Sequence, residues 1–233
     1  MSFNAKQLPS AANKKRPPAL EAGSYPARLV QIILLGIQAS RPYKGEEKPP
    51  RLTMRTTYEL LDEFMKDDEG NDIEDKPRWI TEELPFMSLK ADLAKSTKRY
   101  YALDPEDKAD GDWAKLLEAP CMLTIVAEQD SRPGNDTIYN KVSNVSAMRP
   151  KEAAKAPPLK NPALIWDFYD PDVEVFKEFP EWLQEKIKSA VDFEGSLLER
   201  ALSGGTVVKS KPAKTEQKIA EPPAEEEPDQ EDW

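Results

Sequence analysis

Histidine, cysteine and long apolar runs are scarce or missing in this chain of 233 residues. The absence of histidine excludes Ser-His-Asp and Cys-His catalysis and histidine-ligated metals. A single cysteine, Cys121, excludes an intrachain disulfide and a cysteine-rich zinc site. No apolar run approaches the roughly 18 residues of a membrane span, and residues 1–18 lack the apolar segment of a secretory signal. Carboxylate-only metal or acid/base sites remain possible. We expect a protein away from membranes, in a reducing cytoplasm, and our working hypothesis is a non-enzymatic protein without a cofactor.

Phosphate-binding and metal-binding motifs are also missing. The nine glycines are scattered, with no GxGxxG or GxxxxGK[ST] pattern, so no nucleotide-binding loop is predicted. Residues 62–75 are rich in Asp and Glu, but their spacing is not that of an EF-hand. We interpret this stretch as a solvent-facing hairpin tip, with a carboxylate metal site as the alternative.

Acidic residues are concentrated at the end of the chain. Residues 219–233 hold seven Asp and Glu, no Lys or Arg, three prolines and a terminal Trp233. The net charge is −10, so removing these seven charges leaves only −3 for the rest. Such a segment buries too little apolar surface to offset its ordering entropy, which predicts disorder. We interpret it as a segment that attracts and binds a partner protein through Asp229, Glu231, Asp232 and Trp233. A plain solubilising tail is the alternative.

The first 150 residues contain five segments typical of strands and one typical of a helix. Residues 52–61 alternate between an apolar and a more polar face, and residues 25–39 are apolar and β-branched with a bend expected near Gly36. The predicted strands are 25–39, 52–61, 78–84, 121–127 and 137–148, and the predicted helix is 88–103 with Ser88 as its N-cap. This order predicts a mainly β OB-fold, a five-stranded Greek-key barrel with its helix between strands three and four. A generic α+β sheet is the alternative.

Four parts follow from these patterns. We expect a flexible arm over residues 1–22, an OB-fold body over 23–150, a linker and helical appendage over 151–202, and a disordered tail over 203–233. The appendage contains Trp166, Phe168, Phe176, Phe179 and Trp182, too many aromatic side chains to remain in solvent. It either caps the barrel or forms the interface of a homodimer, and the sequence leaves this choice open.

In an OB-fold the middle strands form the ligand face, flanked by the loops between strands one and two and between strands four and five, and basic and aromatic residues gather there in this sequence. Lys and Arg neutralise a phosphate backbone, and aromatic rings stack on bases without needing a particular sequence. The candidate DNA-binding residues are Arg41, Tyr43, Lys44, Lys48, Arg51, Arg55, Lys95, Lys98, Arg99, Tyr101, Arg132, Tyr139 and Lys141. For Lys95, Lys98 and Arg99 an ordinary solvated helix face is an equal alternative. Tyr58 and Cys121 are expected in the core.

Several segments resemble phage-encoded single-stranded DNA-binding proteins, in particular those of T7-like phages. They are YPARLVQI at 25–32, RPYKGEEKPP at 41–50, LKADLAKSTKRYYALDP at 89–105, MRPKEAAK at 148–155 and the acidic terminus ending in Glu-Asp-Trp. The resemblance implies a protein that coats single-stranded DNA in phage replication, recombination and repair, in the cytoplasm of the bacterial host. It also implies that the tail recruits replication proteins, a DNA polymerase or a helicase-primase, and covers the protein's own DNA groove until DNA displaces it. The chain ends in Trp where the T7-like proteins end in Phe.

Two other functions remain open. An acidic DNA mimic or adaptor that inhibits a host enzyme would spread its acids over the folded body, whereas this body carries only −3. A carboxylate-dependent metal nuclease needs acids that converge from several strands, and the densest acids here lie in one stretch. The hypothesis we take forward is a sequence-tolerant single-stranded DNA-binding protein.

Overall fold

A computed structural model describes residues 18–40, 42, 45–67, 69–129 and 137–204 as a mainly β structure. Five antiparallel strands form a sheet in the order β3-β2-β1-β4-β5, and a sixth, β6, pairs in parallel with β1. The strands are β1 (Gly23–Gln38), β2 (Arg51–Lys66), β3 (Asp72–Pro85), β4 (Pro120–Gln129), β5 (Ile138–Ala147) and β6 (Leu164–Trp166). The five predicted strands are confirmed, and β6, inside the predicted helical appendage, was not foreseen.

The sheet is open rather than closed into the predicted five-stranded barrel. Strands β3 and β5 are its edges, and no pairing joins them among the described residues. The side chain of Arg99 spans this seam instead, with hydrogen bonds to both strands. Strand β1 pairs with two further strands along its length. Its first residues pair with β4, and its later residues pair with β6.

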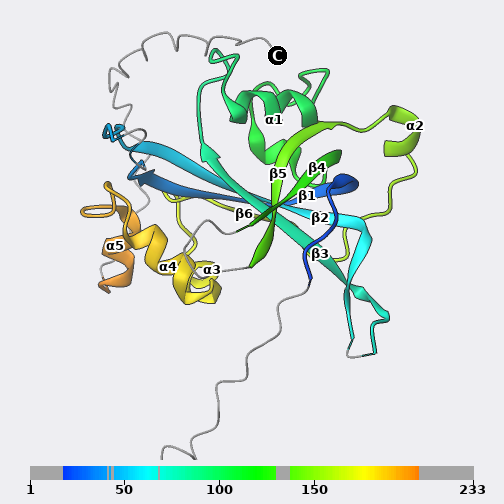
Figure 1. The fold of residues 1–233 in the computed structure, drawn as a ribbon. Helices are drawn as coiled ribbons and strands as arrows, with labels where there is room; N and C mark the ends of the chain where they lie inside the picture. The colour runs from blue at the N-terminus through cyan, green and yellow to red at the C-terminus, as the bar shows by residue number, and fades with distance from the viewer. Residues whose placement is uncertain (1–17, 41, 43–44, 68, 130–136, 205–233) are drawn as a thin grey trace, which may run out of the picture.

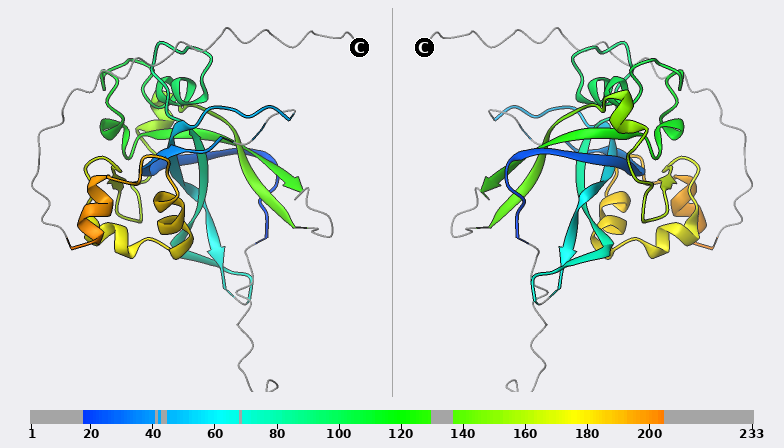
Figure 2. Two further views of the ribbon diagram at one scale, coloured as in Figure 1. Left: turned by 90° about the vertical axis from the view of Figure 1, so that its left-hand side faces the viewer. Right: turned by 90° about the vertical axis from the view of Figure 1, so that its right-hand side faces the viewer.

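The helices form two separate groups (Figures 1 and 2). One lies at the edge between β3 and β5 and consists of α1 (Lys95–Leu103) with the 3-10 helix η2 (Trp113–Leu116). The other is formed by α3 (Val173–Glu178), α4 (Glu181–Lys188) and α5 (Leu197–Leu202), and a single turn, α2 (Pro150–Ala153), precedes it. The two groups cover different sides of the sheet.

Helix α1 begins at Lys95, so the prediction of a helix from Ser88 was wrong. Residues before it form successive turns, in which the amide of Ala91 donates to the carbonyl of Ser88 and that of Ala94 to Ala91. The hydroxyl of Ser96 accepts from the amide of Met87 and holds the turns against the helix. Leu93, in these turns, is 78% exposed.

Two apolar cores hold the molecule together. The main one lies inside the curved sheet under α1 and includes the expected core residues Tyr58 and Cys121, both fully buried. Burial raises the pKa of the Cys121 thiol to about 12, which keeps it protonated and unreactive at neutral pH. The second core packs Trp166, Phe168 and Phe176 of the appendage against Ile33 and Leu35 of β1 and further side chains of α3–α5. The appendage therefore caps the chain's own sheet.

Gly36 allows this cap to approach β1 closely. Its φ is +78°, and the register of β1 against β2 shifts between Leu34 and Ile37, which confirms the predicted irregularity near Gly36. A Cβ at this position would lie 2.9 Å from a carboxylate oxygen of Asp192 and 3.0 Å from the Cβ of Ala190. The same Asp192 accepts a hydrogen bond from the amide of Ile37 at 2.8 Å, so glycine lets backbone and cap meet.

We expect Gly36→Ala to lower the free energy of unfolding by about 2 kcal/mol, because it combines left-handed strain with overpacking. Urea denaturation followed by far-UV circular dichroism measures this change. Gly195→Ala is the matched control, since Gly195 also has a φ of +78° but a Cβ there would meet no described atom within 4 Å. The control reports the backbone strain alone, about 1 kcal/mol. Equal losses in the two variants would show that the close approach at Gly36 contributes nothing.

Candidate nucleic-acid interface

The candidate residues fall into three groups by their place in the structure. Arg41, Tyr43, Lys44 and Arg132, and the tail residues Asp229, Glu231, Asp232 and Trp233, lie outside the described residues. A second group lies apart from the others. Arg51 and Arg55 are on β2, Lys48 precedes this strand, and Arg99 lies in the seam between β3 and β5. Lys95, Lys98, Tyr101, Tyr139 and Lys141 lie on α1 and β5.

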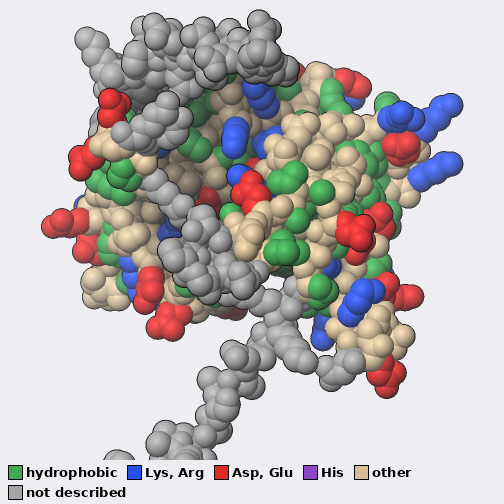
Figure 3. All heavy atoms as spheres, viewed as in Figure 1, with side chains coloured by type: hydrophobic (Ala, Val, Ile, Leu, Met, Phe, Trp, Pro, Cys, Tyr) green, Lys and Arg blue, Asp and Glu red, His purple; other side chains and the backbone are tan. Residues whose placement is uncertain are grey.

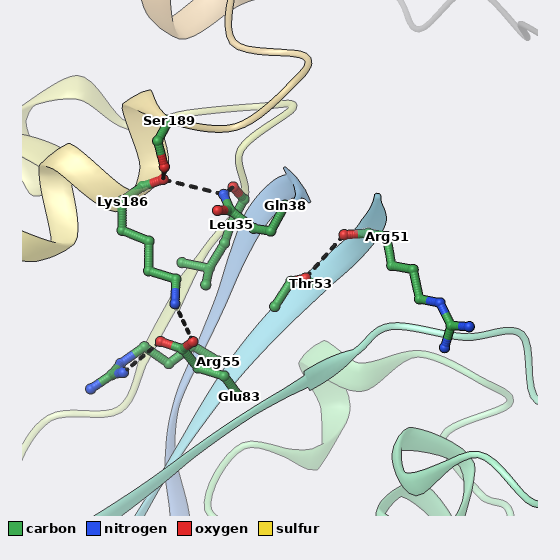
Figure 4. Close-up of polar contacts among 8 residues, drawn as sticks. All are labelled: Leu35, Gln38, Arg51, Thr53, Arg55, Glu83, Lys186 and Ser189. Atoms are coloured by element: carbon green, nitrogen blue, oxygen red, sulfur yellow. Dashed lines mark hydrogen bonds and ion pairs between the residues drawn. The ribbon is translucent and has the colours of Figure 1, made fainter. Parts of the chain in front are cut away.

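The outer face of β2 and β3 is engaged by the appendage rather than free for a ligand (Figure 4). Arg55 donates to Glu83 at 3.0 Å, and its guanidinium carbon lies 4.7 Å from the ring centre of Trp182 on α4. Lys186 of α4 also donates to Glu83. These contacts use the charge of Arg55 to attach α4, whereas the side chain of Arg51 points away from the group in Figure 4.

The linker before β6 covers a further part of this face, around Glu59. Glu59, on the face of β2 predicted to be the more polar one, is only 1% exposed. Its carboxylate accepts from the amide of Lys160 at 2.6 Å, from the side-chain amide of Asn161 at 2.6 Å and from the indole of Trp79 at 3.1 Å. Arg28 fixes the preceding turn of the linker, donating to the carbonyls of residues 156 and 157. The expectation that the middle strands offer an open ligand face is therefore wrong for this part of the sheet.

Arg99 is a structural residue, which removes it from the candidate interface. Its side chain is 4% exposed and donates to both carboxylate oxygens of Glu82 on β3, at 2.9 and 3.2 Å. The same guanidinium donates to the side chain of Asn144 and to the carbonyl of Ser143, both on β5. Tyr58 adds a hydroxyl donor to Glu82; burial, and then the Glu82 carboxylate, hold the pKa of Tyr58 well above its usual value. Arg99 thus bridges the two edges of the open sheet.

The five remaining residues form one exposed surface, which we call the α1–β5 surface: Lys95, Lys98, Tyr101, Tyr139 and Lys141. Helix α1 packs along β5, and the spacing of three residues puts its three members on one helix face. At one end Glu128 of β4 accepts from Lys141 at 2.8 Å and from the hydroxyl of Tyr139 at 3.2 Å. The pKa of Glu128 is lowered, mainly by the hydrogen bond from Lys141. The hydrogen bond from Tyr139 and the nearby charges of Lys141 and Lys95 lower it further. Figure 3 shows Lys and Arg side chains gathered where α1 and β5 meet.

At the other end of the surface α1 and β5 enclose an open groove of about 560 Å³. Its lining residues are Asp92, Thr97, Lys98, Tyr101, Ala102, Pro105, Ser146 and Ala147. Tyr101 is 43% exposed, and its ring meets that of the buried Tyr100 edge to face at 5.4 Å, which supports it from below. Sequence reasoning found Lys98 and Tyr101 but missed Asp92, Pro105 and Ser146, because the groove exists only once α1 packs on β5.

Exposed Lys side chains next to aromatic rings are suited to bind a flexible chain that carries both phosphates and unpaired bases. The ammonium groups neutralise phosphates and the rings offer stacking faces.

Among the described residues no three Asp, Glu or Cys side chains lie close enough together to hold a metal ion. None of the described helices has the length and apolar character needed to cross a bilayer.

Comparison of the chain with protein-family models, with curated proteins and with solved structures finds no match. A functional assignment therefore rests on the sequence and on the structure of the chain itself.

Proposed function

We propose that the chain is a non-enzymatic, sequence-tolerant single-stranded DNA-binding protein that holds the strand along the α1–β5 surface. The observation that carries the proposal is the convergence of five of the nine described candidates, from segments about 40 residues apart, on one exposed surface. Three are cations and two are aromatic. Within the described part of the chain, only Tyr139 and Lys141 of these five make a polar side-chain contact, with the half-buried Glu128. Such a set serves phosphates and bases better than it serves folding.

The strand order supports assignment to the OB-fold. In an OB-fold β1 pairs with β2 and β4, a helix follows β3, and β3 meets β5 to close the barrel. The first two relations are those of this sheet, with α1 after β3. We propose that the protein is an OB-fold left open at the β3–β5 seam, where Arg99 replaces backbone pairing.

The wider role follows from the resemblance of the sequence. We propose that the protein coats single strands during phage replication and recombination in the bacterial cytoplasm. Residues 219–233 would then recruit a polymerase or a helicase-primase through their acidic and aromatic side chains.

Deletion of residues 219–233 should leave or strengthen the affinity for DNA and abolish recruitment of the partner. Loss of DNA binding on deletion would overturn the assigned role of the tail.

Fluorescence anisotropy of labelled oligothymidine across a salt series tests the proposal. Tight binding is expected with single strands and weak binding with duplex. In Lys95→Gln/Lys98→Gln/Lys141→Gln the slope of log affinity against log salt should fall by about 2, since each lost phosphate contact to a single strand contributes about 0.7. Tyr101→Ala should weaken binding about tenfold at constant slope, because it removes a stack.

Lys76→Gln/Lys177→Gln/Lys188→Gln is the matched control, with the same change in net charge at exposed positions on β3, α3 and α4. Its slope should stay near that of the unmodified protein. Equal slopes in both triple variants would place the DNA elsewhere. No binding by the unmodified protein would favour the acidic mimic or adaptor function instead.

A further inference from the structure

We infer that the groove between α1 and β5 receives one unstacked base of the bound strand and that Asp92 makes it prefer guanine. This inference rests on the proposed function and adds to it a preferred ligand at one position. A sequence-tolerant surface of stacking rings and ammonium groups would otherwise treat all four bases alike.

The groove has the size and lining for a nucleotide. Its volume of about 560 Å³ lies within the usual range for small-molecule sites. Ala102, Pro105 and Ala147 supply apolar wall, and Tyr101 supplies a ring whose position Tyr100 supports. Lys98 stands in the same lining and supplies a cation for the phosphate of the same nucleotide. Base, ring and phosphate partners are thus present within a single groove.

Asp92 and Ser146 are the polar groups left to meet the edge of that base. A carboxylate only accepts hydrogen bonds, so it favours an edge with two neighbouring donors. Guanine offers this pair at N1 and its exocyclic amine. Thymine presents a single N–H between two carbonyl oxygens, which a carboxylate repels, and adenine and cytosine set one amine beside an acceptor. Asp92 therefore discriminates for guanine and against thymine.

The fold does not use these polar groups for its own stability. In the described part of the chain, the carboxylate of Asp92, the ammonium of Lys98 and the hydroxyl of Tyr101 form no hydrogen bond or ion pair. This contrasts with Arg55, Arg99 and Glu59, whose charges are all engaged by other parts of the chain. The groove groups remain available for a ligand.

The experiment measures the affinity of the full chain for three labelled strands by fluorescence anisotropy. They are oligothymidine of about 20 nucleotides, more than the site size of a single OB-fold, the same strand with one central guanine, and the same strand with hypoxanthine in place of that guanine. Guanine should raise the affinity about tenfold, the range of a good bidentate base contact, and hypoxanthine, which lacks the exocyclic amine, should lose most of that gain. Asp92→Asn should abolish the preference and strengthen oligothymidine binding slightly, because the carboxylate that repels the thymine carbonyls is gone. Asp75→Asn, an exposed acid on the distant β3, should keep the preference.

The outcomes separate the two proposals. Absence of oligothymidine binding by the unmodified chain would overturn the proposed function. Tight oligothymidine binding with equal affinity for all three strands would overturn the guanine preference alone. A preference that survives Asp92→Asn would remove Asp92 from base recognition.

Discussion

Arg99→Met is expected to lower the free energy of unfolding by about 3–5 kcal/mol, the usual cost of removing one partner of a buried ion pair. The substitution leaves the carboxylate of Glu82, on a side chain 11% exposed, without its cation. It also removes the donors that reach Asn144 and Ser143, so β3 and β5 lose the side chain that spans their seam. Urea denaturation followed by circular dichroism, with the slope as a check on two-state behaviour, measures the loss.

Two further variants define the cause of that loss. Lys98→Met, one residue earlier on the same helix but exposed, should change stability by less than about 0.5 kcal/mol. Arg99→Met combined with Glu82→Gln should be more stable than Arg99→Met alone, because the uncompensated charge is gone. If the double variant is no more stable, the buried carboxylate is not the source of the loss and the bridging role of Arg99 is wrong.

Strand positions were predictable from the sequence because their signals are local. The alternation in residues 52–61 and the β-branched run of 25–39 identify β2 and β1, and Gly36 marks the irregularity in β1. The start of α1 was not predictable in the same way: Ser88 has the chemistry of an N-cap, yet a turn uses it, since Ser96 ties the preceding backbone to the helix. A cap residue shows where a turn begins but not which element follows.

In the candidate site, too, features set by local sequence were predictable, and features set by distant contacts were not. Lys95, Lys98 and Tyr101 share a helix face by their spacing, which a sequence shows. Arg99 differs from Lys98 by one position, and only the packing of α1 over the seam decides that it faces Glu82. Likewise Glu59 has the pattern of a solvent-facing strand residue and becomes buried because residues about a hundred positions later fold over it.

Glu59→Gln is expected to cost about 3 kcal/mol and to loosen the linker, because hydrogen bonds to a charged acceptor contribute about 1.5–3 kcal/mol each. The carboxylate accepts from the amides of Lys160 and Asn161, from the side chain of Asn161 and from the indole of Trp79. A glutamine offers one acceptor oxygen, and its own N–H groups would then face donors. Urea denaturation measures the global loss, and hydrogen exchange at the amides of Lys160 and Asn161 should accelerate before global unfolding.

The same variant tests where DNA does not bind. If the linker and α4 cover a face that DNA never occupies, folded Glu59→Gln protein should bind oligothymidine as tightly as the unmodified chain. Glu74→Gln, on the exposed part of β3, is the control and should change neither stability nor exchange. Unchanged stability and exchange in Glu59→Gln would show that the buried carboxylate does not hold the linker. A large gain in DNA affinity would instead assign the covered face to the ligand, with the linker and appendage as a lid, and would move the interface away from α1 and β5.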